Sequence, residues 1–355
     1  MNIAIDCRLW DQGGVGRYIR NLVYGLQKQD SHNTYTLFIY GNPSIKIQNP
    51  RFSICTTSSR WHSISEQTVF LYNLLKYRFD LVHFPYFSHP IFYNRPFVIT
   101  LHDLTPLTYA TGQATTHHAL LYAIKKIGYR QTLTHALTHA KHILVPTNAV
   151  ANTIRDTYAN APITVTYEGV DESLIHAQPI SISQVKEPFL LYVGNFFPHK
   201  NIPFLLTAYK KVPEALRLVL VGPNDTFARR IQALVHSIGL ENRVLFLHAV
   251  SDGQLRYLYS HAQALVFPSR SEGFGLPVLE ASYFGCPLVL SAIPSFTEIA
   301  VPHTLFFNPY NTESAIHALQ KSAFVKRTPY PIAYKKKFSF ETMAKKTLAI
   351  YNTSV

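Results

Sequence analysis

The chain of 355 residues carries a formal net charge of +13, and 47% of its residues are hydrophobic and 13% aromatic. This apolar content excludes an intrinsically disordered chain, and the length predicts two domains because a single core rarely grows beyond about 250–300 residues. Three widely spaced cysteines without a CxxC pair favour a reducing compartment over a disulfide framework. Neither a signal-peptide pattern nor an apolar run long enough to cross a bilayer is found, so we expect a cytoplasmic protein.

The positive charge suits three kinds of anionic partner: a small acidic substrate, nucleic acid or acidic membrane lipid. Basic residues gather at Lys125/Lys126/Arg130, Lys326/Arg327, Lys335–Lys337 and Lys345/Lys346. These clusters form either solvated helix faces or a surface for peripheral contact with an anionic membrane. Nucleic acid is the weaker alternative, because the aromatic residues alternate with aliphatic ones as core residues do and no nucleic-acid-binding module is recognised.

Short apolar segments alternate with longer helical patterns, which is typical of βαβ units and parallel sheets. Expected strands are Asn2–Asp6, Tyr35–Tyr40, Leu81–Phe84, Phe97–Leu101 and His142–Pro146, then Phe189–Val193, Arg217–Val221, Val244–Leu247, Ala264–Phe267 and Pro287–Ser291. Residues 171–188 lose the periodicity and are expected to connect two domains. At the end of the chain, Ser339 can cap a helix whose apolar face holds Phe340, Met343, Thr347 and Ile350. We therefore predict an α/β protein with two Rossmann-like domains, residues 1–170 and 189–337, and a terminal helix at 338–355.

The segment 267-FPSRSEGFGLPVLE-280 predicts a strand, a glycine-flanked loop and a helix with Pro277 in its first turn. Backbone amides at such a helix start bind phosphate or polar oxygens, so Gly273, Phe274, Gly275 and Leu276 are candidate hydrogen-bond donors to a sugar or a pyrophosphate. Glu272 and Glu280 can accept hydrogen bonds from two hydroxyl clusters, as a sugar and a ribose would offer.

Two further loops follow expected strands. In 194-GNFFPHKN-201, Lys200 stands near a helix start, where its ammonium would neutralise a diphosphate leaving group. In 13-GGVGRY-18, the glycines permit close approach of the backbone to a ligand, but the spacing is not GxGxxG and NAD binding is not predicted.

Histidines raise two alternatives. His102 and Asp103 follow a strand and could form an acid–base pair, but adjacent strand residues point to opposite faces, so a substrate-contacting His102 is preferred. His135, His139 and His142 contain an i, i+4 pair that could bind zinc, yet no carboxylate or cysteine completes a site, so packing or surface roles are preferred, as for His117-His118. The sequence has no Asp-x-Asp metal motif, so we expect a reaction that needs no divalent metal and no cofactor.

Together these motifs resemble glycosyltransferase family 4, the retaining transferases of GT-B fold, and especially its mannosyltransferase-like bacterial members. The likeness includes IDCRLWDQGGVGRYIRNL at the start, LHDLTP, YVGNFFPHKNI, the Glu272–Glu280 segment and the FSFETMAKKTLAIY ending. It implies two facing Rossmann-like domains, with the nucleotide-sugar bound mainly by the second, the acceptor mainly by the first, and the terminal helix returning to the first.

The resemblance also implies roles for single residues. Lys200 would bind the pyrophosphate of the donor, and the backbone of Gly14 would contact the same phosphates. Glu272 would bind the sugar hydroxyls and Glu280 the ribose. Val250 would lie near the base. His102, Glu272 and Lys200 form the expected catalytic set. The acceptor is expected at Gly13, Val15, Arg17, His102 and Asp103. Many members carry arginine where this chain has Asn195 and His199, so Arg270, Arg17 or a protonated His199 are candidates for the missing charge at the donor.

The implied reaction is retaining transfer of a sugar from a nucleotide diphosphate to a hydroxyl of a saccharide or lipid-linked saccharide, in surface polysaccharide, lipopolysaccharide or glycolipid assembly. Mannose from GDP-mannose is the leading expectation, and UDP-sugars are the next. Other GT-B enzymes remain alternatives: a sugar-nucleotide epimerase, or a glycan phosphorylase, which would need a pyridoxal-phosphate lysine and a much longer chain.

Overall fold

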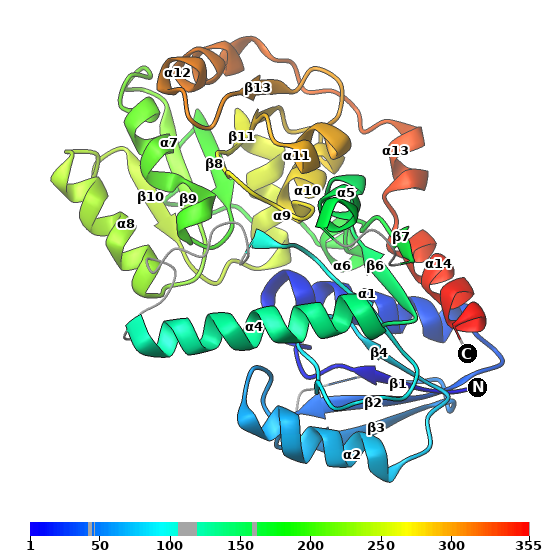
Figure 1. Ribbon diagram of the computed structural model, residues 1–355. Coiled ribbons are helices and arrows are strands. Elements are labelled where there is room, and N and C mark those ends of the chain that lie inside the picture. The colour runs from blue at the N-terminus through cyan, green and yellow to red at the C-terminus, as the bar shows by residue number, and fades with distance from the viewer. Residues whose placement is uncertain (42–44, 46, 106–118, 158–161, 355) are drawn as a thin grey trace. The chain divides into compact units, whose positions relative to one another are not determined.

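The computed structural model describes residues 1–355 except 42–44, 46, 106–118, 158–161 and 355, and only the backbone of 119–126 (Figure 1). The chain divides into two compact units. The first unit consists of Met1–Gly169 and Lys337–Val355, and the second of Val170–Lys336. Each unit contains its own parallel sheet.

The first unit is built on a seven-stranded sheet of order β3-β2-β1-β4-β5-β6-β7. Its strands are β1 (Asn2–Asp6), β2 (Thr34–Tyr40), β3 (Phe52–Thr57), β4 (Leu81–Phe84), β5 (Phe97–Thr100), β6 (His142–Val145) and β7 (Ile163–Val165). Its helices are α1 (Gly13–Gln29), the π-helical turn η1 (Glu66–Phe70), α2 (Leu71–Lys76), α4 (Ala119–His139), α5 (Asn148–Thr157) and α14 (Phe340–Thr353).

Helices cover both faces of this sheet. On one face, Leu74 of α2, Leu133 of α4 and Ile154 of α5 belong to one buried cluster with side chains of β4, β5 and β6. On the other face α14 packs beside α1, as Figure 1 shows, so tightly that a Cβ added to Gly25 would lie 2.4 Å from the Cβ of Ala344. The end of the chain is therefore part of the core of the first unit.

The second unit repeats the architecture with a six-stranded sheet of order β10-β9-β8-β11-β12-β13. Its strands are β8 (Phe189–Val193), β9 (Arg217–Val221), β10 (Val244–Leu247), β11 (Ala264–Phe267), β12 (Leu288–Ser291) and β13 (Leu305–Phe307). Its helical elements are α6 (Glu172–His176), η3 (Pro198–Lys200), α7 (Ile202–Tyr209), α8 (Thr226–Ser237), α9 (Asp252–His261), α10 (Leu276–Tyr283), α11 (Pro294–Ile299), α12 (Thr312–Lys321), η4 (Ser322–Phe324) and α13 (Ile332–Lys337).

All ten expected strands are confirmed, and each end lies within one residue of its expected place. Three strands were not expected: β3, β7 and β13. All three lie at sheet edges. An edge strand is partly exposed to solvent, so it lacks the continuous apolar run by which the central parallel strands are recognised.

The expected connection at 171–188 belongs to the second unit and packs onto it. Its residues 172–176 form α6, and Arg256 of α9 donates hydrogen bonds of 2.8 and 2.7 Å to the carbonyls of Ile175 and Ala177. The terminal helix agrees with its prediction: the Ser339 side chain accepts a hydrogen bond from the amide of Thr342, and the four residues of the expected apolar face are buried. Its packing on the first unit confirms the returning helix that the resemblance implied.

Candidate functional site

The candidate site of the second unit lies at the point where the strand order reverses. From β8 the chain proceeds to β9 and β10 on one side, and from β11 to β12 and β13 on the other. The loops that follow the adjacent strands β8 and β11 therefore diverge, and open α/β sheets bind their ligands at this place. The loop after β8 carries Lys200, and the loop after β11 carries Glu272.

Lys200 and Glu272 are in direct contact. The Nζ atom of Lys200 lies 2.6 Å from Oε1 and 2.8 Å from Oε2 of Glu272, and the two side chains are only 12% and 10% exposed. Ser269 donates a further hydrogen bond of 2.6 Å to Oε1 of Glu272. The structure thus brings together two residues that the sequence analysis had selected independently from different motifs.

Backbone and side-chain hydrogen bonds hold the two loops together. The amide of Arg270 donates to the carbonyl of His199 over 2.8 Å. Asn201, which is buried and has a φ of 60°, donates to the carbonyls of Pro268 and Pro309 over 3.2 and 3.1 Å. Sequence reasoning missed Asn201 and Ser269. The only signal for Asn201 was its place before a helix, where asparagine tolerates the left-handed conformation.

The helix start expected near Pro277 is confirmed. Helix α10 begins at Leu276, Pro277 occupies its second position, and no side chain caps its first turn. Gly275 has a φ of 103°, and a Cβ at this position would lie 2.7 Å from the ring of Phe296. Of the expected amide donors, Gly273 and Phe274 are buried, whereas Gly275 and Leu276 are partly exposed. Pro277 has no amide hydrogen, and the amides of Val278 and Leu279 donate to the carbonyl of Gly275 over 2.9 and 3.4 Å, so the helix start offers the amide of Leu276 to a ligand.

The remaining donor candidates lie around the same sheet end. Glu280 is 1% exposed, and its Oε2 accepts a hydrogen bond of 2.8 Å from Tyr259 of α9. Asn195 follows β8, and its side-chain oxygen accepts from the amide of Phe197 over 3.4 Å. His199 precedes Lys200 in η3, and Val250 is half-buried between β10 and α9. Glu280 is therefore an interior carboxylate held by a phenol, unlike the partly exposed Glu272.

The glycine-rich segment of the first unit begins a helix after β1. Helix α1 starts at Gly13, which has a φ of 48°, and no side chain caps it. Gly13 and Gly14 are exposed, and Val15 and Arg17 are half-exposed. Gly16 is required by packing, since a Cβ there would lie 2.4 Å from a carbonyl oxygen of the preceding loop. Strand β1 borders β4 at the order reversal of this sheet, so this helix start has the same topological position as the loop after β8.

His102 has a carboxylate partner, but that partner is Glu168 and not Asp103. Its Nδ1 lies 3.2 Å from Oε1 of Glu168, and its Nε2 lies 3.0 Å from the carbonyl oxygen of Pro85. Asp103 instead accepts a hydrogen bond of 2.9 Å from the amide of Thr105. The acid–base alternative for His102 and Asp103 therefore fails on geometry. No motif in the sequence indicated Glu168, because it lies 66 residues further along the chain.

Comparison with known protein families finds two adjacent matches. A family described as Glycosyltransferase Family 4 matches residues 12–174, and one described as Glycosyl transferases group 1 matches residues 177–323. The O-antigen chain mannosyltransferase RfbU of Salmonella typhimurium is 31% identical over 261 residues, which are 72% of this chain and 69% of that protein. The chain belongs to glycosyltransferase family 4. The O-antigen chain mannosyltransferase B of Escherichia coli is 33% identical over 172 residues, 46% of this chain and 45% of that one.

Solved structures share the fold of this glycosyltransferase over its whole length. Sucrose-phosphate synthase from Thermosynechococcus elongatus superimposes with a TM-score of 0.78 at 21% identity, covering 99% of this chain and 98% of that chain. WaaG, a glycosyltransferase involved in lipopolysaccharide biosynthesis, superimposes with a TM-score of 0.72 at 17% identity. The match covers 98% of this chain and 99% of that chain. These likenesses confirm the GT-B class, with two parallel-sheet Rossmann-like domains.

The zinc alternative finds no support in the described part of the glycosyltransferase. There, no group of three histidine, cysteine, aspartate or glutamate residues could hold a metal ion. Nδ1 of His135 lies 2.9 Å from Nε2 of His89, and His142 bonds to Thr164 over 2.7 Å. Burial lowers the pKa of His135 and His142, and it lowers the pKa of His89 to about 4. His117 and His118 lie outside the described residues.

Several residues of the basic clusters have structural partners. Arg327 donates to the carbonyl oxygens of Tyr259 and Ala262, and Lys346 donates to the carbonyl of Val165 over 3.2 Å. The side chains of Lys125 and Lys126 lie outside the described part. Among the helices that the structure describes, none combines the length and the apolar character needed to traverse a bilayer.

Proposed function

We propose that this glycosyltransferase moves mannose from a nucleotide diphosphate donor to a hydroxyl of a saccharide or lipid-linked saccharide, with retention of the anomeric configuration, in the assembly of a surface polysaccharide or glycolipid. The names of the relatives, O-antigen chain mannosyltransferases, support the sugar and the pathway. GDP-mannose is the preferred donor. UDP-sugars come second, because the Anabaena protein HepE, solved in complex with UDP and glucose, shares the fold with a TM-score of 0.73.

The contact between Lys200 and Glu272 is the observation that carries the proposal. A ligand with a negative diphosphate next to a hydroxyl-rich ring is complementary to an ammonium and a carboxylate less than 3 Å apart. In the absence of donor the two charges compensate each other in a mostly buried place. A bound diphosphate competes for the ammonium, and the oxygens of Glu272 then accept hydrogen bonds from the sugar hydroxyls.

Negative charge develops on the diphosphate when its bond to the anomeric carbon breaks. Lys200, the uncapped start of α10 and the backbone of Gly14 would stabilise this charge, which lowers the barrier more than contacts made equally in the ground state. The acceptor oxygen forms the new bond from the same face, and its proton passes to the departing phosphate oxygen. Glu280 would hold the ribose, and His102 would lie beside the reacting sugar.

The proposed reaction needs no metal ion and takes place at the inner face of the membrane. We expect transfer without a divalent metal, because the sequence has no Asp-x-Asp motif. We also expect the enzyme to act in the cytoplasm, where basic residues such as Lys335 and Lys345 would contact the anionic inner face of the membrane peripherally.

A donor screen tests the function. Purified enzyme is incubated with GDP-mannose and a panel of UDP-sugars, with and without EDTA, and release of the nucleotide diphosphate is measured with and without saccharide acceptors. The proposal expects one preferred donor, acceptor-stimulated release and no effect of EDTA. Lys200→Ala should abolish release, whereas Lys210→Ala, the loss of an exposed lysine, should not. Interconversion of free nucleotide-sugars without transfer would favour the epimerase alternative and overturn the proposal.

A further inference from the structure

The segment 58–65 of the first unit lies across the carboxyl ends of three strands. It leaves the edge strand β3 and places the ring of Trp61 5.8 Å from the ring of Tyr40, the last residue of β2. The ring of His62 stacks on Tyr86, two residues beyond β4, with centroids 5.5 Å apart and an interplanar angle of 27°. The ends of parallel strands are where this class of sheet binds ligands, so the segment borders the ligand-binding edge of the unit.

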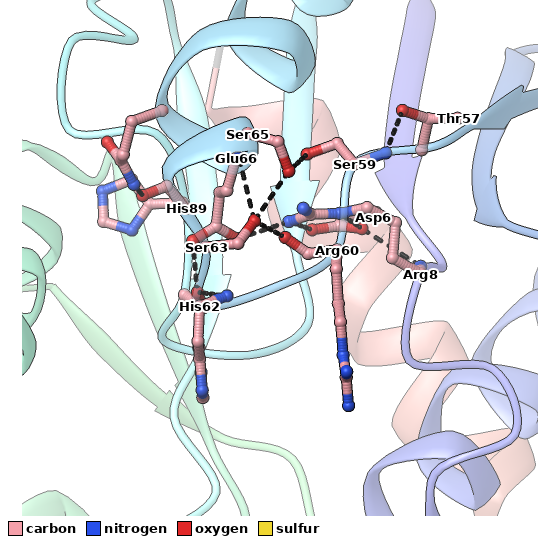
Figure 2. A network of polar contacts seen from close by, with 12 residues as sticks. Asp6, Arg8, Thr57, Ser59, Arg60, His62, Ser63, Ser65, Glu66 and His89 are labelled. Carbon is pink, nitrogen blue, oxygen red and sulfur yellow. Dashed lines mark hydrogen bonds and ion pairs between the residues drawn. The ribbon is translucent and has the colours of Figure 1, made fainter. Parts of the chain in front are cut away.

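A buried ion triad anchors this segment. Arg8, just beyond β1, donates to both oxygens of Asp6 over 2.8 and 2.7 Å and to Oε1 of Glu66 over 2.6 Å. Ser88 connects the triad to the segment, because its hydroxyl donates to Oε2 of Glu66 over 2.6 Å and accepts from the amide of His62 over 3.4 Å. Figure 2 shows this network. Separating the charges of such a buried triad would leave an uncompensated charge in the interior, which costs free energy. The triad therefore holds Arg8, Asp6 and Glu66 in one geometry.

Serine hydroxyls fix the backbone of the segment itself. Ser63 donates to the carbonyl of Arg60 over 2.5 Å and lies 2.7 Å from the hydroxyl of Ser65, which in turn accepts from Ser59 over 3.3 Å. His62 has a φ of 55°, a conformation that costs free energy for a residue other than glycine. The π-helical turn η1 begins directly afterwards. Both features persist only where surrounding structure enforces them, and both are frequent at functional sites.

The residues held in this way present their side chains outward. Arg60 and His62 are exposed, and Figure 2 shows their side chains extending in the same direction, away from the buried network. The guanidinium of Arg60 lies 5.2 Å from the ring of Trp61, and no carboxylate within the described ranges forms an ion pair with it. A stacked pair of flat rings suits the apolar face of a pyranose, and a guanidinium suits a phosphate or carboxylate.

The stack adjoins the residues expected to contact the acceptor. His102 bonds through Nε2 to the carbonyl of Pro85, the residue before Tyr86. Asp103 follows His102 directly in the chain, and its side chain accepts a hydrogen bond of 2.9 Å from the amide of Thr105. Arg60, His62 and Tyr86 therefore extend the expected acceptor surface of His102 and Asp103 toward the edge strand.

We propose that Arg60, His62 and Tyr86 form an acceptor subsite, in which the His62–Tyr86 stack packs against a pyranose ring of the acceptor and Arg60 pairs with an anionic group that the acceptor carries. The inference rests on the proposed function, since it assigns the substrate class of the same enzyme. Arg8, Glu66 and Ser88 are positioning residues that hold the subsite in shape. The anionic group is either the diphosphate of a lipid-linked sugar or the carboxylate of a uronic acid.

Acceptor kinetics and binding test the subsite. Arg60→Gln should raise the KM for anionic acceptors by about 10- to 100-fold, as expected for loss of a charge-assisted hydrogen bond, and leave the KM for neutral oligosaccharides unchanged. Comparing a sugar linked to diphosphate with a uronate-containing oligosaccharide of the same sugars distinguishes the two anions. Arg51→Gln removes an exposed arginine at the opposite end of β3 and is the matched control.

His62→Gly tests the stack, because glycine adopts the same positive φ without strain and lacks the ring. It should raise the KM for every acceptor, and donor hydrolysis in the absence of acceptor should stay unchanged in both variants. Calorimetric binding of the acceptors without donor gives a readout that does not depend on transfer. Equal affinity of Arg60→Gln, His62→Gly and the unmodified enzyme for all acceptors would overturn the subsite, whereas absence of acceptor-stimulated nucleotide release in the unmodified enzyme would overturn only the proposed function.

Discussion

The hydroxyl of Tyr351 lies 2.6 Å from Nδ1 of His83, although 268 residues separate them. The other ring nitrogen of His83 lies 2.8 Å from the hydroxyl of Thr100, and all three residues are buried. This contact connects α14 to the central strands β4 and β5 of the first unit. A buried polar group that loses its partner costs free energy, so the contact makes the stability of this unit depend on the end of the chain.

Replacement of Tyr351 by phenylalanine should therefore lower the free energy of unfolding by about 1–3 kcal/mol, because it leaves Nδ1 of His83 without a partner and changes little else. Urea unfolding followed by fluorescence measures the effect. Tyr24→Phe, which removes the hydroxyl of an exposed tyrosine on α1, should have almost no effect. Equal stability of the two variants would show that the contact contributes nothing.

The stability of the first unit should fall as the pH decreases below about 6.5. Burial lowers the pKa of His83 to about 3 and that of His89 to about 4. The unfolded chain protonates these histidines near pH 6.5, whereas the folded chain does so only near pH 3 to 4, so the unfolded state binds more protons between these values. Each histidine should cost on the order of 2 kcal/mol at pH 5. The urea midpoint should fall less between pH 7.5 and pH 5 in His83→Gln than in the unmodified protein. An equal fall in the two proteins would contradict the lowered pKa of His83.

Lys200 and Glu272 should be required for transfer and not for folding. Both Lys200→Ala and Glu272→Ala should reduce kcat/KM by roughly 100-fold or more, because the proposed function places Lys200 at the departing diphosphate and Glu272 at the sugar hydroxyls. Circular dichroism should still show a folded protein, since the two side chains lie in the loops after β8 and β11 and belong to neither strand. Turnover close to normal in either variant would refute the role of that residue.

No other residue should replace Gly275, because its φ is positive and the ring of Phe296 leaves no room for a Cβ atom. Gly275→Ala introduces a Cβ 2.7 Å from the Phe296 ring at a φ of 103°, which should distort the start of α10 and raise the donor KM. Gly239→Ala is a matched control, because its φ is 72° and a Cβ there meets nothing within 4 Å. The control should lose about 1–2 kcal/mol of stability from the positive φ alone and keep its donor KM.

Glu280 should act in donor binding, with Tyr259 as its positioning residue. Glu280→Ala should raise the donor KM with little change in kcat, since a ribose contact is equal in the ground and transition states. Tyr259→Phe removes the hydrogen bond to Oε2 of Glu280 and should produce a smaller rise of the same kind. A fall in kcat at constant KM in either variant would place Glu280 at the reacting centre instead.

The sequence alone determined the sheet class, ten of the strands, the helix start at Pro277 and the two loops that carry Lys200 and Glu272. These features are local: a central parallel strand is apolar on both faces, and a helix start depends on a few consecutive residues. Edge strands such as β3 were missed because their exposed side chains break that pattern.

Only the tertiary structure decided which distant side chains meet. It paired His102 with Glu168 instead of the neighbouring Asp103, joined the loops of Lys200 and Glu272 through Asn201, and anchored the segment of Arg60 through buried charges. Such contacts depend on the order of the strands in the sheet and on the packing of loops at their ends. No spacing along the chain encodes them, because each partner is recognisable only once the sheet has brought it close.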